Sequence, residues 1–140
     1  MSIPVLRHQK HKKQAKHNKG LLQEHCFPDP CTVKTVMYKD WNITVTFYVA
    51  LHYIQSYLCK NRMRYGYRTN FRNHNDRNNY LARISVRDSR INQIVTDYIA
   101  LFKASCIARY NPCSYKRLNN RDLCDYEKFA SQDLPKALGI

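Results

Sequence analysis

The chain has 140 residues, and its 24 Lys and Arg outnumber its ten Asp and Glu, so its net charge is +14 at pH 7. This length fits one domain, because single domains most often contain about 100–150 residues. Such a surplus is more than solubility requires and indicates a polyanionic partner, most simply RNA or DNA, because phosphate neutralisation releases counterions. An acidic protein or a ribosome-like assembly would satisfy the same charge.

The first twenty residues are strongly basic. They contain six Lys or Arg, three His and no acid, and they lack the apolar segment of a signal peptide. We therefore predict that residues 1–14 form a flexible arm that becomes ordered along phosphates. The lysines expected to contact nucleic acid in the basic N-terminal segment are Lys12, Lys13 and Lys16. Residues 15–140 are expected to form a single helical domain, which starts with a helix over residues 15–26.

The segment Asp40–Lys60, DWNITVTFYVALHYIQSYLCK, predicts the central helix. Asp40 suits a helix N-terminus, since a carboxylate accepts free N–H groups and complements the helix dipole. Apolar side chains surround most of the helix, which is typical of a helix inside a bundle. Polar residues such as Asn42 and Gln55 argue against a membrane span. His52 on this helix is interpreted as a hydrogen-bonded core histidine, with a catalytic or ligand role as the alternative.

Further helices are predicted along the rest of the chain. One begins near residue 75 and ends at residue 86, and a second long helix begins at Ser89 as its N-cap and ends before Asn111-Pro112. A weaker helix follows over residues 122–131, and residues 133–138 start another turn. The pattern therefore predicts an all-α fold, a bundle of four to five helices with a basic N-terminal arm.

Residues 61–79 combine five arginines and one acid with several aromatic rings. Arginine offers forked donors to phosphate, and aromatic faces stack on unpaired bases, so this composition is typical of a site for single-stranded nucleic acid. The residues that we expect to contact nucleic acid here are Arg62, Arg64, Tyr65, Tyr67 and Arg72. The alternative is an exposed connector whose rings pack against the bundle.

The six cysteines, at positions 26, 31, 59, 106, 113 and 124, form no CxxC pair. Their spacing argues against a structural zinc site. Cys59 and Cys106 lie inside helical patterns, where a free thiol acts as a small apolar side chain. We therefore expect reduced cysteines, a cytoplasmic protein, and no metal or cofactor.

Three motifs occur in a recognisable order. They are Ala50-Leu51-His52 on the central helix, HNDRN from His74 to Asn78, and Y-x-x-L-x-x-x-S-x-x-A-R-Y from Tyr98 to Tyr110. Together they resemble a group of small prokaryotic proteins with a HEPN-like helical bundle. The resemblance covers roughly residues 15–111. It implies a bundle that is commonly dimeric, in a superfamily that includes metal-independent endoribonucleases of toxin, antiviral defence and RNA-processing systems, some of which act with an antitoxin or in a larger complex.

The usual signature of that superfamily is an Arg separated by four to six residues from a His. Arg68 and His74 have five residues between them and meet this spacing. The alternative pair is His74 with Arg77. By the resemblance, His74 would act as acid or base, because imidazole exchanges protons near neutral pH, and arginine would clamp the phosphate. Arg109 and Tyr110 would support them.

The remaining site residues expected from the resemblance are His52, Tyr98 and Ser105, as buried support. We also predict from helix geometry that His74, Arg77 and Arg109 converge at one rim of the bundle. His74 and Arg77 lie one turn apart, and a short connection places the next helix antiparallel to theirs. The competing hypothesis is a non-catalytic nucleic-acid-binding or scaffold subunit with the same fold.

Overall fold

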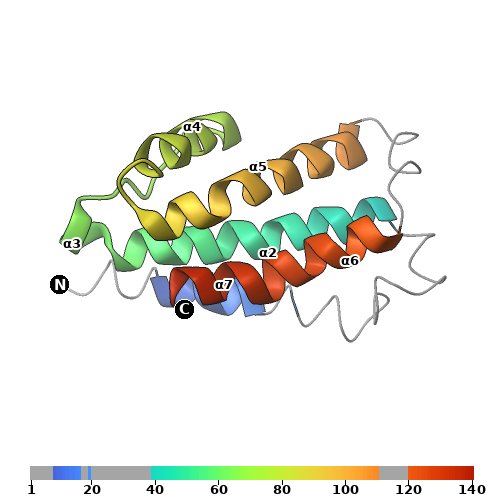
Figure 1. Ribbon diagram of the computed structural model, residues 1–140, viewed down its shortest axis with the longest axis horizontal. Helices are drawn as coiled ribbons and strands as arrows, with labels where there is room; N and C mark the ends of the chain where they lie inside the picture. Colours follow the sequence, from blue (N-terminus) through green and yellow to red (C-terminus); the bar gives the residue numbers. More distant parts are fainter. Residues whose placement is uncertain (1–7, 17–18, 20–38, 111–119) are drawn as a thin grey trace.

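The computed structural model describes residues 8–16, 19, 39–110 and 120–140, and helices dominate these residues. The helices are α2 (Lys39–Lys60), α3 (Arg62–Tyr65), α4 (His74–Ile84), α5 (Ser89–Tyr110), α6 (Asn120–Lys128), the π-helical turn η3 (Phe129–Asp133) and α7 (Leu134–Leu138). They pack side by side in an elongated bundle with α2 at its centre (Figure 1). The prediction of an all-α bundle is confirmed.

Helix α2 is central because it is apolar on nearly every side. It packs against α5, α6, η3 and α7, and the side chains of Phe47, Val49, Ile54 and Leu58 are fully buried. Burial of each such large apolar side chain contributes about 1.5–3 kcal/mol to folding, so this helix anchors the core. The predicted bounds, Asp40–Lys60, differ from the observed ones by one residue at the start.

Helices α4 and α5 are joined by a short connection, in which the backbone N–H groups of Arg87 and Asp88 donate to Ile84. The N-cap of α5 is Asp88, whose Oδ1 accepts from the backbone N–H groups of Arg90 at 2.9 Å and Ile91 at 3.3 Å. The prediction of Ser89 as the cap is therefore wrong by one residue. The longer reach of the Asp88 carboxylate satisfies two of the free N–H groups of the first turn.

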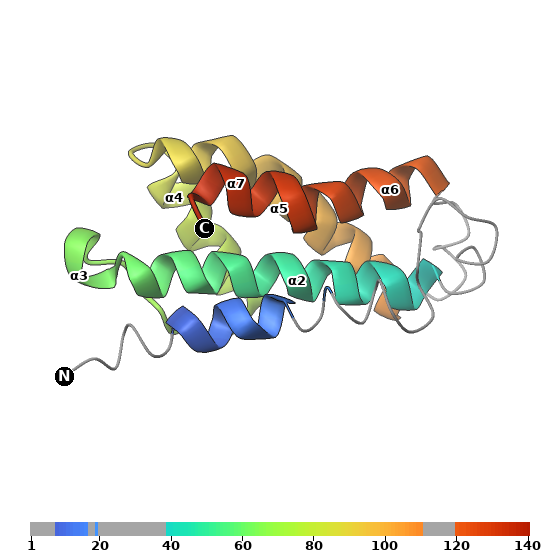
Figure 2. The same ribbon diagram turned by 90° about the horizontal axis from the view of Figure 1, so that it is seen from below.

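The C-terminal segment is nearly continuous, since α6, η3 and α7 follow one another without a break (Figure 2). Pro135 lies near the start of α7 and has no N–H to continue the helical ladder. A π-helical turn just before it accommodates this missing bond, and the Ser131 hydroxyl donates to the carbonyl of Glu127 at 2.6 Å. The two predicted C-terminal helices are thus one rod that packs along α2.

Residues 8–16 form a helix that lies along α2, on the side away from α6 and α7 (Figure 2). His8 Nδ1 contacts the backbone carbonyl of Ser56 at 2.8 Å, and Ala15 is fully buried. The sequence predicted a flexible arm up to residue 14, and the structure differs because these two residues dock the segment onto the core. The predicted helix over residues 15–26 lies largely outside the described residues.

The cysteines follow the prediction in part. Cys59 and Cys106 are free, as expected, whereas Cys124 is disulfide-bonded. Reduced cysteines were expected because the spacing of the residues gave no sign of pairing, but spacing along the chain does not fix which Cα atoms come within the 4.4–6.8 Å that a disulfide needs. No helix in the described residues combines the length and apolarity needed to cross a membrane.

Candidate functional site

The candidate site begins at the first turn of α4. Asn73 has an extended backbone and its side-chain oxygen accepts the backbone N–H of Asp76 at 2.8 Å, so it caps the helix. This cap fixes His74 as the first helical residue. Arg77, three residues later, then projects from the same face, as helical spacing requires.

The imidazole of His74 packs among aromatic rings from two other helices. Its ring centroid lies 5.4 Å from that of Phe47 on α2, in an edge-on arrangement, and 5.5 Å from that of Phe102 on α5. Phe47 is fully buried, whereas His74 is partly exposed. The ring is therefore held by the core on one side and reaches solvent on the other.

Arg77 links His74 to the loop before α4. Its Nη1 donates to His74 Nδ1 at 3.2 Å, and its Nε donates to Gln55 Oε1 at 3.3 Å. The amide of Gln55 in turn donates to the carbonyl of Thr69 at 3.1 Å, which fixes the orientation of the Gln55 side chain. Arg has donors only, so the Nδ1 of His74 is the acceptor and its neutral ring carries the proton on Nε2.

Arg109, near the end of α5, approaches the same rings from the other side. Its Nε donates to the carbonyl of Ser105 at 3.3 Å, and its Nη2 donates to the Ser105 hydroxyl at 3.4 Å. Its guanidinium carbon lies 5.8 Å from the centre of the Phe47 ring, within cation–π range. Phe47 thus separates and positions His74 and Arg109, and the predicted convergence of His74, Arg77 and Arg109 at one rim is observed.

The electrostatics of the cluster follow from this crowding of cations. Burial, together with the charges of Arg77 and Arg109, lowers the pKa of His74 below its ordinary value. Burial and the charge of Arg77 likewise lower the pKa of His52, whose Nδ1 lies 3.2 Å from His11 Nδ1. Both imidazoles therefore favour the neutral form, which is the form that can accept a proton.

The two predicted buried supports on α5 lie where they were expected. Tyr98 and Ser105 are fully buried, and the Tyr98 ring lies 5.8 Å from Phe47. Burial raises the pKa of the Tyr98 hydroxyl. Tyr110 is the last residue of α5, and its side chain lies outside the described part of the structure.

Arg68 does not join the cluster. Its guanidinium makes an ion pair with Asp76 at 3.0 Å and lies over the rings of Phe71 and Tyr80. The arginine in contact with His74 is therefore Arg77, and the spacing-based pair of Arg68 and His74 is not formed. Arg68 precedes the helix, so no helical register aligns it with His74.

The residues predicted to contact nucleic acid divide into two groups. Arg62, Arg64, Arg72 and Lys13 are exposed, as is Lys16, while Tyr65 is 49% exposed and Lys12 partly so. Tyr67 is only 5% exposed and its hydroxyl donates to Asp88, so the prediction of a free stacking face is wrong for this residue. Its ring packs between neighbouring tyrosines instead.

Sequence reasoning missed three contributors to this region. Phe47 is the ring on which the cluster is built, Gln55 orients Arg77, and His11 brings the N-terminal helix against His52. The rings of His11 and His52 are also stacked, with centroids 5.4 Å apart. A Gln on a helix that the sequence predicts to be buried is a signal for such a role, because buried amides need hydrogen-bond partners.

Comparisons of the chain with protein-family models, curated proteins and solved structures gave no match.

Proposed function

We propose that the protein binds RNA and acts as a metal-independent endoribonuclease with a HEPN-like bundle, in a toxin, defence or RNA-processing system. The observation that supports the proposal is the convergence of His74, Arg77 and Arg109 around Phe47. In the described part of the chain, the partners of His74 and Arg77 are aromatic rings, neutral polar groups and other cations. Arg77 thus offers charged donors beside His74, and a phosphodiester is the anion that the net charge of the chain favours.

The proposed chemistry uses Arg77 as a gate for His74. In the absence of RNA, Arg77 donates to His74 Nδ1, so that lone pair is engaged. A phosphate oxygen is a stronger acceptor for a guanidinium than imidazole is, and binding of the phosphodiester would transfer the donors of Arg77 to it. The lone pair on His74 Nδ1 then becomes available as a base.

Cleavage would follow by attack within the RNA strand. The 2′-oxygen bonds to phosphorus as its proton passes to His74, and the bond from phosphorus to the 5′-oxygen breaks as that oxygen takes a proton from an acid. The products are a 2′,3′-cyclic phosphate and a 5′-hydroxyl end. Arg77 and Arg109 would stabilise the charge that develops on the phosphoryl oxygens. A second copy of the chain in a homodimer is one source of the acid.

The basic N-terminal helix fits the same proposal, since it extends the positive surface beside the cluster. Residues 8–16 contain four lysines, and His11 of this helix contacts His52, whose pKa is lowered by burial and by the charge of Arg77. Phosphates on either side of the cleaved bond would lie along this helix. Binding through phosphates weakens strongly as the salt concentration rises, so RNA affinities must be compared at one salt concentration.

A non-catalytic RNA-binding or scaffold subunit is the second candidate function. The observation that favours it is the engagement of His74 Nδ1 by Arg77, together with the packing of the ring between Phe47 and Phe102. The variant His74→Ala distinguishes the two functions. Under the first, it should slow cleavage at least about 100-fold and leave RNA affinity within a few-fold of the wild type. Under the second, no cleavage occurs in either protein.

The cytoplasm is the proposed location, because a ribonuclease of this kind meets its RNA there. The disulfide at Cys124 is an observation against a cytoplasmic location, because stable disulfides are rare in reducing compartments. Thiol alkylation of the protein taken directly from cells decides the matter. Complete labelling of Cys124 without reductant supports the cytoplasm, and protection of Cys124 contradicts it.

A further inference from the structure

A second cationic site lies at the other end of α4 from His74. A cavity of about 480 Å³ opens between the end of α2, helix α3 and the start of α5, and its lining includes Tyr57, Arg64, Tyr67, Arg87, Asp88 and Arg90. Ligand pockets in proteins commonly measure about 300–1,000 Å³, so the size suits a small molecule or a chain end. Arg87 follows His74 by 13 residues, which at a helical rise of about 1.5 Å per residue corresponds to a separation of about 20 Å.

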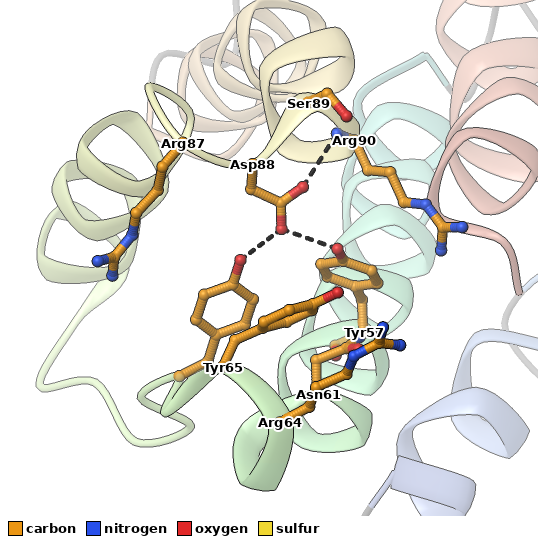
Figure 3. A pocket seen from close by; sticks show the side chains of 9 residues that line it. Tyr57, Asn61, Arg64, Tyr65, Arg87, Asp88, Ser89 and Arg90 are labelled. Atoms are coloured by element: carbon orange, nitrogen blue, oxygen red, sulfur yellow. Dashed lines mark hydrogen bonds between the residues drawn. The ribbon is translucent and has the colours of Figure 1, made fainter.

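Asp88 is the one carboxylate among the lining residues, and both of its oxygens accept hydrogen bonds from other parts of the chain. Its Oδ1 caps α5, and its Oδ2 accepts the hydroxyls of Tyr57 at 2.8 Å and Tyr67 at 2.5 Å (Figure 3). Burial alone would raise the pKa of Asp88, but the hydrogen bonds from these two tyrosines hold it below its ordinary value. The carboxylate therefore stays charged and is a structural anchor.

The tyrosines form a neutral floor. Burial is the largest cause that raises the pKa of both Tyr57 and Tyr67, and the hydrogen bond to Asp88 is the second. Neither hydroxyl therefore ionises near neutral pH. Tyr65, which also lines the cavity, is 49% exposed and presents its ring at the edge. The guanidinium of Arg64 lies over this ring, and the Tyr67 ring packs against it with a centroid distance of 5.4 Å, so Tyr65 forms part of the wall of the cavity.

The arginines give the cavity its charge. The side chain of Arg87 extends on one side of the tyrosines, and those of Arg64 and Arg90 on the other (Figure 3). Arg90 donates to the carbonyl of Leu138 at 3.2 Å, and Arg64 lies over the Tyr65 ring, but neither Arg64 nor Arg87 makes an ion pair within the described residues. Three guanidinium groups against one carboxylate leave 3 − 1 = +2 on the lining.

We propose that this cavity binds the terminal phosphate monoester of a nucleotide, with the phosphate held by Arg87 and the rest of the nucleotide in the cavity. A monoester carries nearly two negative charges at pH 7, which matches the lining, whereas a phosphodiester within a strand carries one. The source is either the 5′-phosphate end of an RNA or a free nucleoside 5′-monophosphate. The site is separate from His74 and does not require cleavage.

The test is calorimetric titration of the full chain with adenosine 5′-monophosphate, with adenosine, and with one short RNA that carries either a 5′-phosphate or a 5′-hydroxyl. The phosphorylated ligand of each pair should bind at least about tenfold more tightly, since charge-assisted hydrogen bonds to arginine are lost with the phosphate. Arg87→Ala should reduce this preference about tenfold. Arg87 is exposed, so this variant should fold.

The matched control is Arg62→Ala, which removes the same charge from α3 at a residue that does not line this cavity. It should leave the preference for the phosphorylated ligand intact. Tight binding of adenosine 5′-monophosphate itself identifies the free nucleotide as ligand, and tight binding of the phosphorylated RNA alone identifies the RNA end. Equal affinity for phosphorylated and unphosphorylated ligands overturns the proposal. An equal loss of the preference for the phosphorylated ligand in Arg62→Ala and Arg87→Ala also overturns it. His74→Ala should keep the wild-type preference for phosphorylated ligands, because His74 does not line this cavity. This expectation holds whether or not the wild type cleaves RNA.

Discussion

Substitution of Phe47 tests whether the core of the bundle positions the candidate site. The ring is fully buried and contacts Tyr48, His74, Tyr98 and Phe102, with centroid distances of 5.3–5.8 Å. It also lies under the guanidinium of Arg109. Phe47→Leu keeps an apolar side chain there but removes every one of these ring contacts.

The expected cost follows from those contacts. An aromatic pair contributes about 0.5–1.5 kcal/mol beyond its buried area, a cation–π contact contributes about 0.5–1 kcal/mol, and hydrophobic swaps of similar volume usually cost under about 1.5 kcal/mol. These contributions overlap, so Phe47→Leu should lower the free energy of unfolding by about 1–2 kcal/mol. Phe47→Ala leaves a cavity and should lower it by about 3–5 kcal/mol.

The assay combines urea unfolding with NMR of the histidine side chains. In folded Phe47→Leu, the imidazole signals of His74 should shift, because the ring has lost the edge contact that orients it. Leu58→Ala is the control, since Leu58 is also fully buried on α2, about three turns away. It should cost about 2–5 kcal/mol and leave the His74 signals in place. Unchanged His74 signals in Phe47→Leu, or equal shifts in both variants, would refute the reasoning.

Three further predictions concern stability and binding. Leu51→Ala should lower the free energy of unfolding by about 2–5 kcal/mol, and a loss below about 1 kcal/mol in denaturation would place Leu51 outside the core. Burial, the largest cause in each case, lowers the pKa of His8, His52 and His74. Their contribution to stability is therefore complete above pH ~6.5 and is lost as the pH falls through the lowered pKa values. A urea concentration at the unfolding midpoint that stays constant as the pH is lowered below ~6 would contradict this. RNA affinity should fall steeply with salt, by close to one unit of log–log slope per neutralised phosphate, and a flat titration would exclude binding through phosphates.

The long helices were predictable because their signals are periodic and local. Helices α2 and α5 have apolar residues at helical spacing over 22 residues each, and the proximity of His74 and Arg77 follows from one turn of helix. The approach of Arg109 to them followed from a short connection between antiparallel helices. These inferences need no knowledge of side-chain packing.

The rest depended on contacts between residues distant in the chain. The spacing of Arg68 and His74 gave no sign that Asp76 takes the guanidinium of Arg68. Tyr67 is buried because Asp88, 21 residues later, accepts its hydroxyl, and the docking of residues 8–16 depends on Ser56, 48 residues after His8. Composition correctly described these segments as basic and aromatic but could not indicate which rings the fold covers.

The most direct test of the central claim is cleavage of RNA in the presence of EDTA, with the wild type compared with His74→Ala. General acid–base catalysis contributes about 10²–10⁴-fold, so the variant should cleave at least about 100-fold more slowly while its RNA affinity stays within a few-fold of the wild type. The products of the wild type should end in 2′,3′-cyclic phosphates. Equal cleavage by both proteins, or no cleavage by a wild type that binds RNA, would contradict the assignment of His74 as the catalytic base.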